Sequence, residues 1–324
     1  MRAQRCVALD GPEGLRLEED LPTPDDEQGT RILVDVTAAG VSFPELLYCT
    51  GRYQERPALP FIPGVEVAGT VARAPEGGRF AVGDRVVAAT FFGGWATQVA
   101  ADPTMTFPLP PQLDDAQGAA LVMNYQTAYF ALRLRGRLAS GETLLVQGAG
   151  GGLGTAAVQV GVGLGARVIG LVSSTDKADA ALAAGAHEVV LVREGWARAV
   201  RARTAGRGVD VVFDVVGGDR FVDGLRCLAV DGRVIVVGFT GGPIPEVRVN
   251  RLLLTNTEIV GAAWGPYTRV DPSMPQAVHA ALLPLITGGV VRPVVGPRFP
   301  LEGAPDALRV LQDRAAVGKV VLEL

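Results

Sequence analysis

The chain has 324 residues, a formal net charge of −4 and 20% charged residues. A chain of this length usually forms domains of about 100–200 residues, so we expect two. The sequence has no basic cluster, which argues against a nucleic-acid partner. No apolar run reaches the ~18 residues that cross a membrane, and the N-terminus lacks the apolar stretch of a signal peptide. Three widely spaced cysteines indicate neither a disulfide framework nor a zinc ribbon, so we expect a cytoplasmic protein.

Residues 1–120 show the pattern of short β-strands separated by turn residues. Their spacing suggests a small, irregular β-barrel or sandwich. The β-prone runs are 5–8, 15–18, 30–38, 65–72 and 85–89. From residue 114 the pattern changes, and 116–123 and 127–135 carry helical spacing without proline.

From residue 141 onward, β-prone runs alternate with helical segments. Such strand–helix–strand crossovers predict an α/β fold with a doubly wound, six-stranded parallel sheet, the Rossmann architecture. The expected strands are 144–147, 167–172, 188–192, 209–215, 233–239 and 258–263. The expected helices are 155–164, 176–184, 195–204, 218–228 and 249–256.

The last part of the chain predicts a return to the first domain. Its expected elements are a helix at 276–287, a strand at 290–295, a helix at 304–314 and a strand at 319–324. The predicted division is therefore a first domain at 1–121, an inserted α/β domain at 122–264 and a returning part of the first domain at 265–324.

A glycine-rich loop follows the first strand of the predicted parallel sheet. Its residues are Gly148, Ala149, Gly150, Gly151, Gly152, Leu153 and Gly154. Residues without a Cβ atom let the backbone approach a pyrophosphate, and the helix that follows offers free N–H groups and a positive dipole end. Glycine strings also occur in ordinary turns, but the placement between a strand and a helix favours dinucleotide binding.

The tip of the second strand indicates which dinucleotide binds. Binders of NAD place an acidic residue about 20 residues beyond the loop. This chain has Ser173, Ser174 and Lys177 there, which suit a 2′-phosphate and therefore NADPH. We interpret Asp176 as a helix N-terminal residue that points away from the ribose; alternatively, the whole stretch only caps a helix. Arg193 could add a cation on the adenine side, or it could lie in solvent.

Three further segments carry a resemblance to a known family. They are residues 38–46 with 51–53, residues 60–69 with 83–86, and residues 124–129. Together with the glycine loop, they resemble the medium-chain dehydrogenase/reductase superfamily along essentially the full chain. The most similar branch is the zinc-free NADPH:quinone oxidoreductases of the zeta-crystallin type. The resemblance implies a Rossmann domain inserted in a GroES-like irregular β-barrel domain, and a homodimer.

The same resemblance bears on zinc. Alcohol dehydrogenases of this superfamily carry Cys at the position of Ser42, His at that of Val65 and another Cys near Met123. Catalytic zinc needs three protein ligands, so we predict that no metal binds. Without a metal, alcohol oxidation is disfavoured. Hydride transfer from NADPH to a quinone or an α,β-unsaturated carbonyl needs mostly positioning against nicotinamide C4.

Several site residues follow from the resemblance. Ser42 stands where the family usually has Asn, and its hydroxyl could substitute for the amide. Tyr53 matches a position that lines the active cleft, where a phenol could donate to the carbonyl oxygen; the alternative is a packed loop tyrosine. Asn124 and Thr127 match positions near the nicotinamide, although Asn124 could instead cap a helix. Lys319 matches a position where the last strand reaches back towards the cofactor.

The ends of the later strands should contact the cofactor, because ligands of a doubly wound sheet bind at the carboxyl ends of its strands. We interpret Asp214, an acid near this edge, as structural. The expected contacts are Val216, Gly238, Phe239, Thr240 and Trp264.

The leading interpretation is an NADPH-dependent quinone reductase. An enoyl-thioester or alkenal reductase uses the same motifs, and Arg52 and Arg56 could serve a thioester at the mouth of the site. A non-enzymatic NADPH-binding protein is a third possibility. For the dimer, the strand at 258–263 and residues 267–270 could extend the sheet across a two-fold axis.

Overall fold

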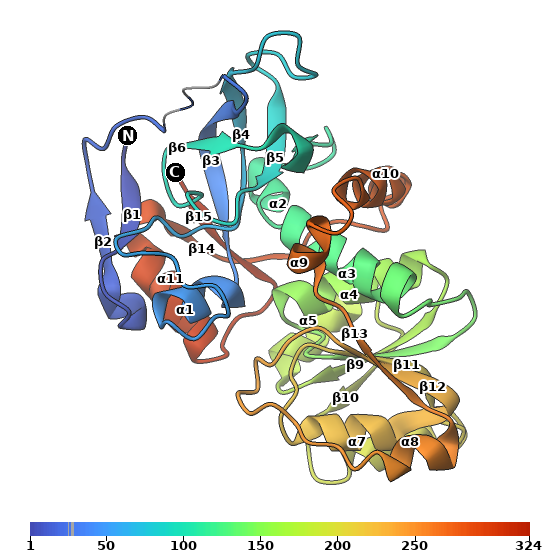
Figure 1. The fold of residues 1–324 in the computed structure, drawn as a ribbon. Coiled ribbons are helices and arrows are strands. Elements are labelled where there is room, and N and C mark those ends of the chain that lie inside the picture. The colour runs from blue at the N-terminus through green and yellow to red at the C-terminus, as the bar shows by residue number, and fades with distance from the viewer. Residues whose placement is uncertain (25, 27–28) are drawn as a thin grey trace. The chain divides into compact units, whose positions relative to one another are not determined.

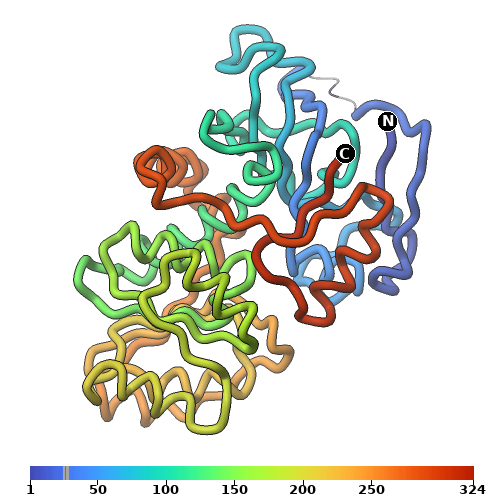
Figure 2. The backbone as a smooth tube through the Cα atoms, turned by 180° about the vertical axis from the view of Figure 1, so that it is seen from behind, coloured from blue at the N-terminus to red at the C-terminus, as the bar shows by residue number. Residues whose placement is uncertain are grey.

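The computed structural model describes residues 1–24, 26 and 29–324. The chain forms two compact units (Figure 1). The first unit comprises Met1–Met123, Ser273–Ala280 and Pro293–Leu324, and both chain ends lie in it (Figure 2). The second unit comprises Asn124–Pro272 and Ala281–Arg292. The structure thus places residues 265–272 and 281–292 with the second unit, whereas the sequence division assigned them to the returning part of the first domain.

The first unit is built on a seven-stranded sheet in the order β14-β15-β3-β4-β5-β7, with β6 also paired to β3. All of its pairs are antiparallel except β14 with β15. The strands are β3 (Ile32–Val41), β4 (Glu66–Arg73), β5 (Arg85–Ala89), β6 (Gln98–Ala101), β7 (Thr106–Pro108), β14 (Val295–Pro300) and β15 (Lys319–Glu323). A separate hairpin joins β1 (Ala3–Cys6) and β2 (Leu15–Glu18). The predicted β-rich character is confirmed, although β6 and β7 were not predicted.

Short helices complete the first unit. They are α1 (Phe43–Cys49), α2 (Asp115–Gly118) and α11 (Ala304–Gln312). Helix α1, which the sequence analysis missed, begins directly after β3 with Ser42 as its N-cap and Pro44 in its first turn. Proline fits there because the first N–H groups of a helix have no intrahelical partner.

One predicted strand, at 290–295, is wrong. Helix α10 (Met274–Thr287) ends in a glycine pair, and Gly289 has a φ of 74°. The backbone N–H groups of Val290 and Val291 both donate to the Leu285 carbonyl at 2.9 Å, so they cap the helix and do not join a sheet. Strand β14 therefore begins only at Val295.

The second unit contains the predicted six-stranded parallel sheet, in the order β10-β9-β8-β11-β12-β13. Its strands are β8 (Thr143–Gln147), β9 (Arg167–Val172), β10 (Glu188–Leu191), β11 (Val209–Asp214), β12 (Leu228–Val236) and β13 (Glu258–Gly261). The chain enters this sheet at the central strand β8 and adds β9 and β10 on one side. It then returns to the centre, where β11 pairs with the other side of β8. Ligands of such sheets bind at this switch point. All five residues of β8 are buried, as expected for a strand covered on both faces.

Helices connect these strands. They are α4 (Gly152–Gly163), α5 (Thr175–Ala183), α6 (Trp196–Ala202), α7 (Arg220–Cys227) and α8 (Asn250–Thr255), and α9 (Trp264–Thr268) follows the last strand. A helical run precedes the sheet, with α3 (Thr127–Tyr129) between the π-helical segments Val122–Gln126 and Phe130–Arg135. The strand predicted at 233–239 in fact ends at Val236, because the next residues turn to bond the end of β11.

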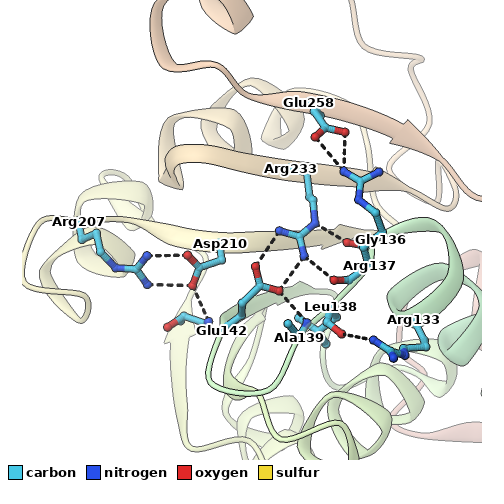
Figure 3. Close-up of polar contacts among 11 residues, drawn as sticks. Arg133, Gly136, Arg137, Leu138, Ala139, Glu142, Arg207, Asp210, Arg233 and Glu258 are labelled. Carbon is cyan, nitrogen blue, oxygen red and sulfur yellow. Dashed lines mark hydrogen bonds and ion pairs between the residues drawn. The ribbon is translucent and has the colours of Figure 1, made fainter.

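A charged network ties the strands together at their amino-terminal edge (Figure 3). Arg233 of β12, only 7% exposed, donates to both carboxylate oxygens of Glu142, at 2.9 and 2.7 Å, just before β8. Arg137 pairs with Glu258 at the start of β13 at 2.7 Å, and its carbonyl accepts from Arg233 at 3.1 Å. The charged groups at this edge therefore bond one another. Ligands of doubly wound sheets bind at the opposite, carboxyl edge.

Candidate functional site

The glycine loop leaves β8 and enters α4 in a conformation that depends on missing side chains. A Cβ atom on Gly154 would lie 2.0 Å from the carbonyl oxygen of Gly148. A Cβ atom on Gly150 would lie 2.5 Å from the Lys177 Cβ and 2.7 Å from its backbone oxygen. Gly151 is the N-cap of α4, so the free N–H groups of this 12-residue helix start inside the loop.

The tip of β9 lies beside this loop. Because Gly150 packs on the backbone of Lys177, the first turn of α5 is held against the glycine loop. The Ser174 hydroxyl accepts from the Lys177 N–H at 3.4 Å and caps the helix, and Asp176 lies in the first turn as predicted. The structure thus brings Lys177 to the loop, while Ser174 performs the capping role that was the alternative interpretation. Ser173 is exposed.

Arg193 lies further along the same edge. It is exposed, lies two residues after the end of β10, and borders a hollow of about 440 Å³ that Ala178, Leu191 and Trp196 also line. Its role on the adenine side stays a prediction.

The turns that follow β11 and β12 are hydrogen-bonded to each other. Asp214 is 1% exposed, and its Oδ1 accepts from the N–H groups of Val216 at 2.8 Å and Gly217 at 2.9 Å. Burial raises the pKa of Asp214. The Thr240 hydroxyl donates to the Val215 carbonyl at 3.0 Å, which brings residues 238–240 to this edge. Asp214 therefore shapes the backbone of the turn, as its structural interpretation requires.

Two further predicted residues lie in the helical run of the second unit. Asn124 is 7% exposed and lies inside the π-helical segment Val122–Gln126, so it does not cap a helix. Thr127 is half-buried and begins α3. Trp264, also predicted as a cofactor contact, is buried at the start of α9.

In the first unit, a buried carboxylate organises the start of α1. Glu45 is fully buried; its Oε2 accepts from the Ser42 N–H at 3.1 Å and its Oε1 from the Val65 N–H at 3.1 Å. Burial raises the pKa of Glu45 to about 7, against the opposing effect of the Lys319 ammonium. One side chain thus fixes two backbone positions, 42 and 65, at which zinc-dependent relatives would carry ligands.

A buried ion pair lies beside it. Lys319, 3% exposed, donates from Nζ to the Oε1 of fully buried Glu66 at 2.5 Å and also to the Ser42 hydroxyl oxygen. The other Glu66 oxygen accepts from the Met123 N–H at 2.9 Å. The ion pair therefore bonds two of the three positions at which zinc-dependent relatives would carry ligands. Lys319 bonds the Ser42 side chain, and Glu66 bonds the Met123 backbone.

These residues do not fit a zinc ion. Zinc takes thiolate, imidazole or carboxylate ligands, and the three positions carry a hydroxyl at Ser42 and apolar side chains at Val65 and Met123. The Lys319 ammonium would repel a divalent cation. In the part of the chain that the structure describes, no cluster of three or more His, Cys, Asp or Glu side chains could hold a metal.

Sequence reasoning missed both glutamates of this cluster. Their signal was present: Glu45 and Glu66 are isolated acids within apolar runs, and the chain has only two lysines with which to pair them. Burying a carboxylate without a partner costs several kcal/mol, so an acid in such a run implies a hidden partner.

Tyr53 lies in the loop after α1. Its ring packs on that of Tyr48 at 4.4 Å between centroids, and Tyr48 contacts Phe92 at 4.7 Å. Burial, followed by the nearby Glu55 carboxylate, raises the pKa of Tyr53, so its phenol keeps its proton. Tyr53 is half-buried, so the packed-tyrosine alternative describes its ring well, while a donor role for its hydroxyl stays a prediction.

Comparisons with known proteins agree with these features. Residues 28–111 match the family described as alcohol dehydrogenase GroES-like domain, and residues 152–282 match that described as zinc-binding dehydrogenase. Quinone oxidoreductase-like protein 2 of Bos taurus is 37% identical over 327 residues, covering 100% of this chain and 92% of that protein. Quinone oxidoreductase of Rattus norvegicus is 35% identical over 328 residues, covering 100% and 98%.

Solved structures show the same relationship. A probable oxidoreductase from Mycobacterium abscessus is 44% identical with a TM-score of 0.92, covering 100% of this chain and 99% of that one. Quinone oxidoreductase of Thermus thermophilus, solved also with NADPH, is 37% identical with a TM-score of 0.87, covering 100% of both chains. The Escherichia coli quinone oxidoreductase complexed with NADPH is 29% identical with a TM-score of 0.91 and the same full coverage.

A GroES-like sheet domain joined to a doubly wound sheet with a glycine loop defines the class of medium-chain dehydrogenases/reductases. Within it, this chain belongs to the quinone oxidoreductase family. The resemblance and the fold class inferred from the sequence are confirmed. Among the residues that the structure describes, no helix has the length and apolar character to cross a membrane.

The loop geometry yields a first prediction. Gly150→Ala should lower the free energy of unfolding by about 1–3 kcal/mol, because its Cβ would displace the backbone of α5. Gly151→Ala is the matched control: its nearest atom would be 3.6 Å away, so we expect a change below about 1 kcal/mol. Urea unfolding of the cofactor-free protein measures both, and equal losses would contradict the packing argument.

Proposed function

We propose that this oxidoreductase transfers hydride from NADPH to a quinone and needs no zinc. The enzyme class follows from the family, and relatives solved with NADPH support the cofactor. The strand tip with Lys177 and no acid at its end supports the same choice. The observation that carries the zinc-free part is the contact of the Lys319 ammonium with Ser42 and Glu66. A quinone is already electrophilic, so hydride transfer to it requires positioning more than Lewis-acid activation.

The alternative acceptor is an enoyl thioester or an alkenal. Arg52 and Arg56 are exposed on the loop that carries Tyr53, where cations could bind the phosphates of an acyl-thioester carrier. Both acceptors are conjugated carbonyl compounds that would take hydride from the same cofactor. The rates of turnover with each acceptor must therefore decide between them.

The proposal is tested by following NADPH oxidation at 340 nm in protein freed of metal with a chelator. We expect turnover of 1,4-benzoquinone and phenanthrenequinone, unchanged after chelation, and slower turnover of crotonyl-CoA and 2-alkenals. Turnover of only the thioester would replace the quinone assignment with the enoyl reductase. Loss of activity on chelation would contradict the zinc-free mechanism, and tight NADPH binding without any turnover would indicate a non-enzymatic role.

We further propose that Lys177, with Ser173 and Ser174, recognises the 2′-phosphate. Lys177→Ala should raise the Kd for NADPH at least about 10-fold, since a hydrogen bond to a charged group is worth about 1.5–3 kcal/mol. The Kd for NADH should stay within about 2-fold. Fluorescence titration measures both, and the exposed Arg198→Ala on α6 is the control. An equal loss for both dinucleotides would refute the role of Lys177.

A homodimer is proposed from the free edge of the parallel sheet. Strand β13 is the last strand in the order, and exposed apolar side chains precede and follow it along the chain: Leu253 is 78% exposed, Leu254 79% and Val270 73%. An unpaired edge flanked by exposed apolar groups suits pairing with a second copy across a two-fold axis.

Substitution of these leucines tests the dimer. Leu253→Glu with Leu254→Glu should shift the protein from dimer to monomer in sedimentation velocity, because two charges would be buried in the interface. Val82→Glu, at a 71% exposed position in the first unit, should leave the dimer intact. A wild-type protein that sediments as a monomer at micromolar concentration would exclude the interface.

A further inference from the structure

The hydrogen bonds of the Ser42 hydroxyl are fixed in direction by its partner. A lysine ammonium can only donate, so the Ser42 oxygen is the acceptor of the bond from Lys319. The proton of the Ser42 hydroxyl must then point to another acceptor. Among the described residues, the structure shows none for it. Ser42 is half-buried, whereas Lys319 and Glu66 are almost completely buried, so the hydroxyl is the accessible end of this chain of groups.

Three neighbouring strands of the first unit's sheet, β15, β3 and β4, hold this arrangement. Strand β15 pairs antiparallel with β3, with Val320 opposite Val41, and this register sets Lys319 beside Ser42. The Lys319 N–H donates to the Val294 carbonyl at 2.8 Å. Glu66 begins β4, which pairs with the other side of β3. A cation, its carboxylate and the hydroxyl are thus placed by three neighbouring strands, without any flexible loop.

We propose that Lys319 and Glu66 are positioning residues that hold the Ser42 hydroxyl as hydrogen-bond and proton donor to the carbonyl oxygen of the acceptor. This inference rests on the proposed function and assigns the proton donor of that reaction. The fixed ammonium does here what a metal does in zinc-dependent relatives: it favours negative charge on the oxygen of the substrate. A preorganised donor of this kind stabilises the transition state in which that charge develops.

The reaction balances as a two-electron reduction. Hydride leaves C4 of NADPH with both electrons and bonds to the acceptor, giving NADP⁺ and an anion with its charge on the former carbonyl oxygen. The Ser42 O–H bond breaks as its proton moves to that oxygen, and a proton of the Lys319 ammonium moves to Ser42 Oγ. Lys319 then regains a proton from water through Ser42 after the product leaves. The sum is acceptor, NADPH and one proton giving reduced acceptor and NADP⁺.

The first test removes the hydroxyl alone. Ser42→Ala should lower kcat for 1,4-benzoquinone about 100-fold, the usual effect of losing one such donor, with little change in the Kd for NADPH. Ser42→Thr keeps a hydroxyl and should restore kcat to within about 5-fold of the wild type, since it restores that same donor. Thr50→Val removes a hydroxyl from the other end of α1, where Thr50 bonds the Leu46 carbonyl, and serves as the matched control.

The second test distinguishes donation from mere packing. A packing defect should slow all acceptors equally. Loss of a donor should slow acceptors with a more basic reduced oxygen, such as methylnaphthoquinone, more than benzoquinone. Lys319→Met should show the same dependence on the acceptor, and the double variant with Ser42→Ala should be no slower than the slower single one, because both act through one hydroxyl.

These outcomes separate this inference from the proposed function. A wild-type protein that reduces quinones together with a fully active Ser42→Ala variant would overturn the donor role and leave the function intact. A wild-type protein that reduces no quinone would overturn the function itself. If Lys319→Met does not fold, Ser42→Ala and Ser42→Thr still decide the question, because Ser42 lies at the accessible end of the network.

Discussion

The ion pair between Lys319 and Glu66 is the interaction on which the first unit's site depends. Taking both charges out of water costs several kcal/mol for each, and their attraction offsets this cost only with good geometry and further hydrogen bonds. The structure supplies these bonds: Glu66 accepts a second one from the Met123 N–H, and Lys319 donates a second one to Ser42. A buried pair of this kind is weak evidence for stability and better evidence for a required position of its charges.

The two units divide the work between them. In the second unit, the charged network at the amino edge satisfies the strand starts, and the glycine loop, Lys177 and the turn at Asp214 shape the carboxyl edge. In the first unit, three strands and the start of α1 place one hydroxyl on a buried cation. The first set of features suits a dinucleotide, and the second is the donor that we propose for the acceptor oxygen.

Much of the fold could be predicted from sequence because it follows from local periodicity. The alternation of apolar runs with helical segments predicted the parallel sheet, and the glycine loop predicted dinucleotide binding. Helix α1 was missed because a seven-residue helix has little periodicity, although Ser42 and Glu45 have the spacing of a capping box. Only the second bond of Glu45, from the Val65 N–H, depends on tertiary structure. The strand predicted at 290–295 was wrong because its N–H groups close a helix end, which hydropathy does not reveal. Ser42 and Lys319 were both singled out, but their contact joins residues 277 positions apart and required the sheet register.

A crystal structure of the protein with NADP⁺ and a quinone tests the central claim most directly. If Ser42 is the proton donor, a quinone oxygen should lie within about 3 Å of Ser42 Oγ, with Lys319 still bonded to Ser42 and Glu66. A structure in which Lys319 leaves Glu66 to bind the cofactor phosphates, or in which a metal ion lies beside Ser42, would contradict that role.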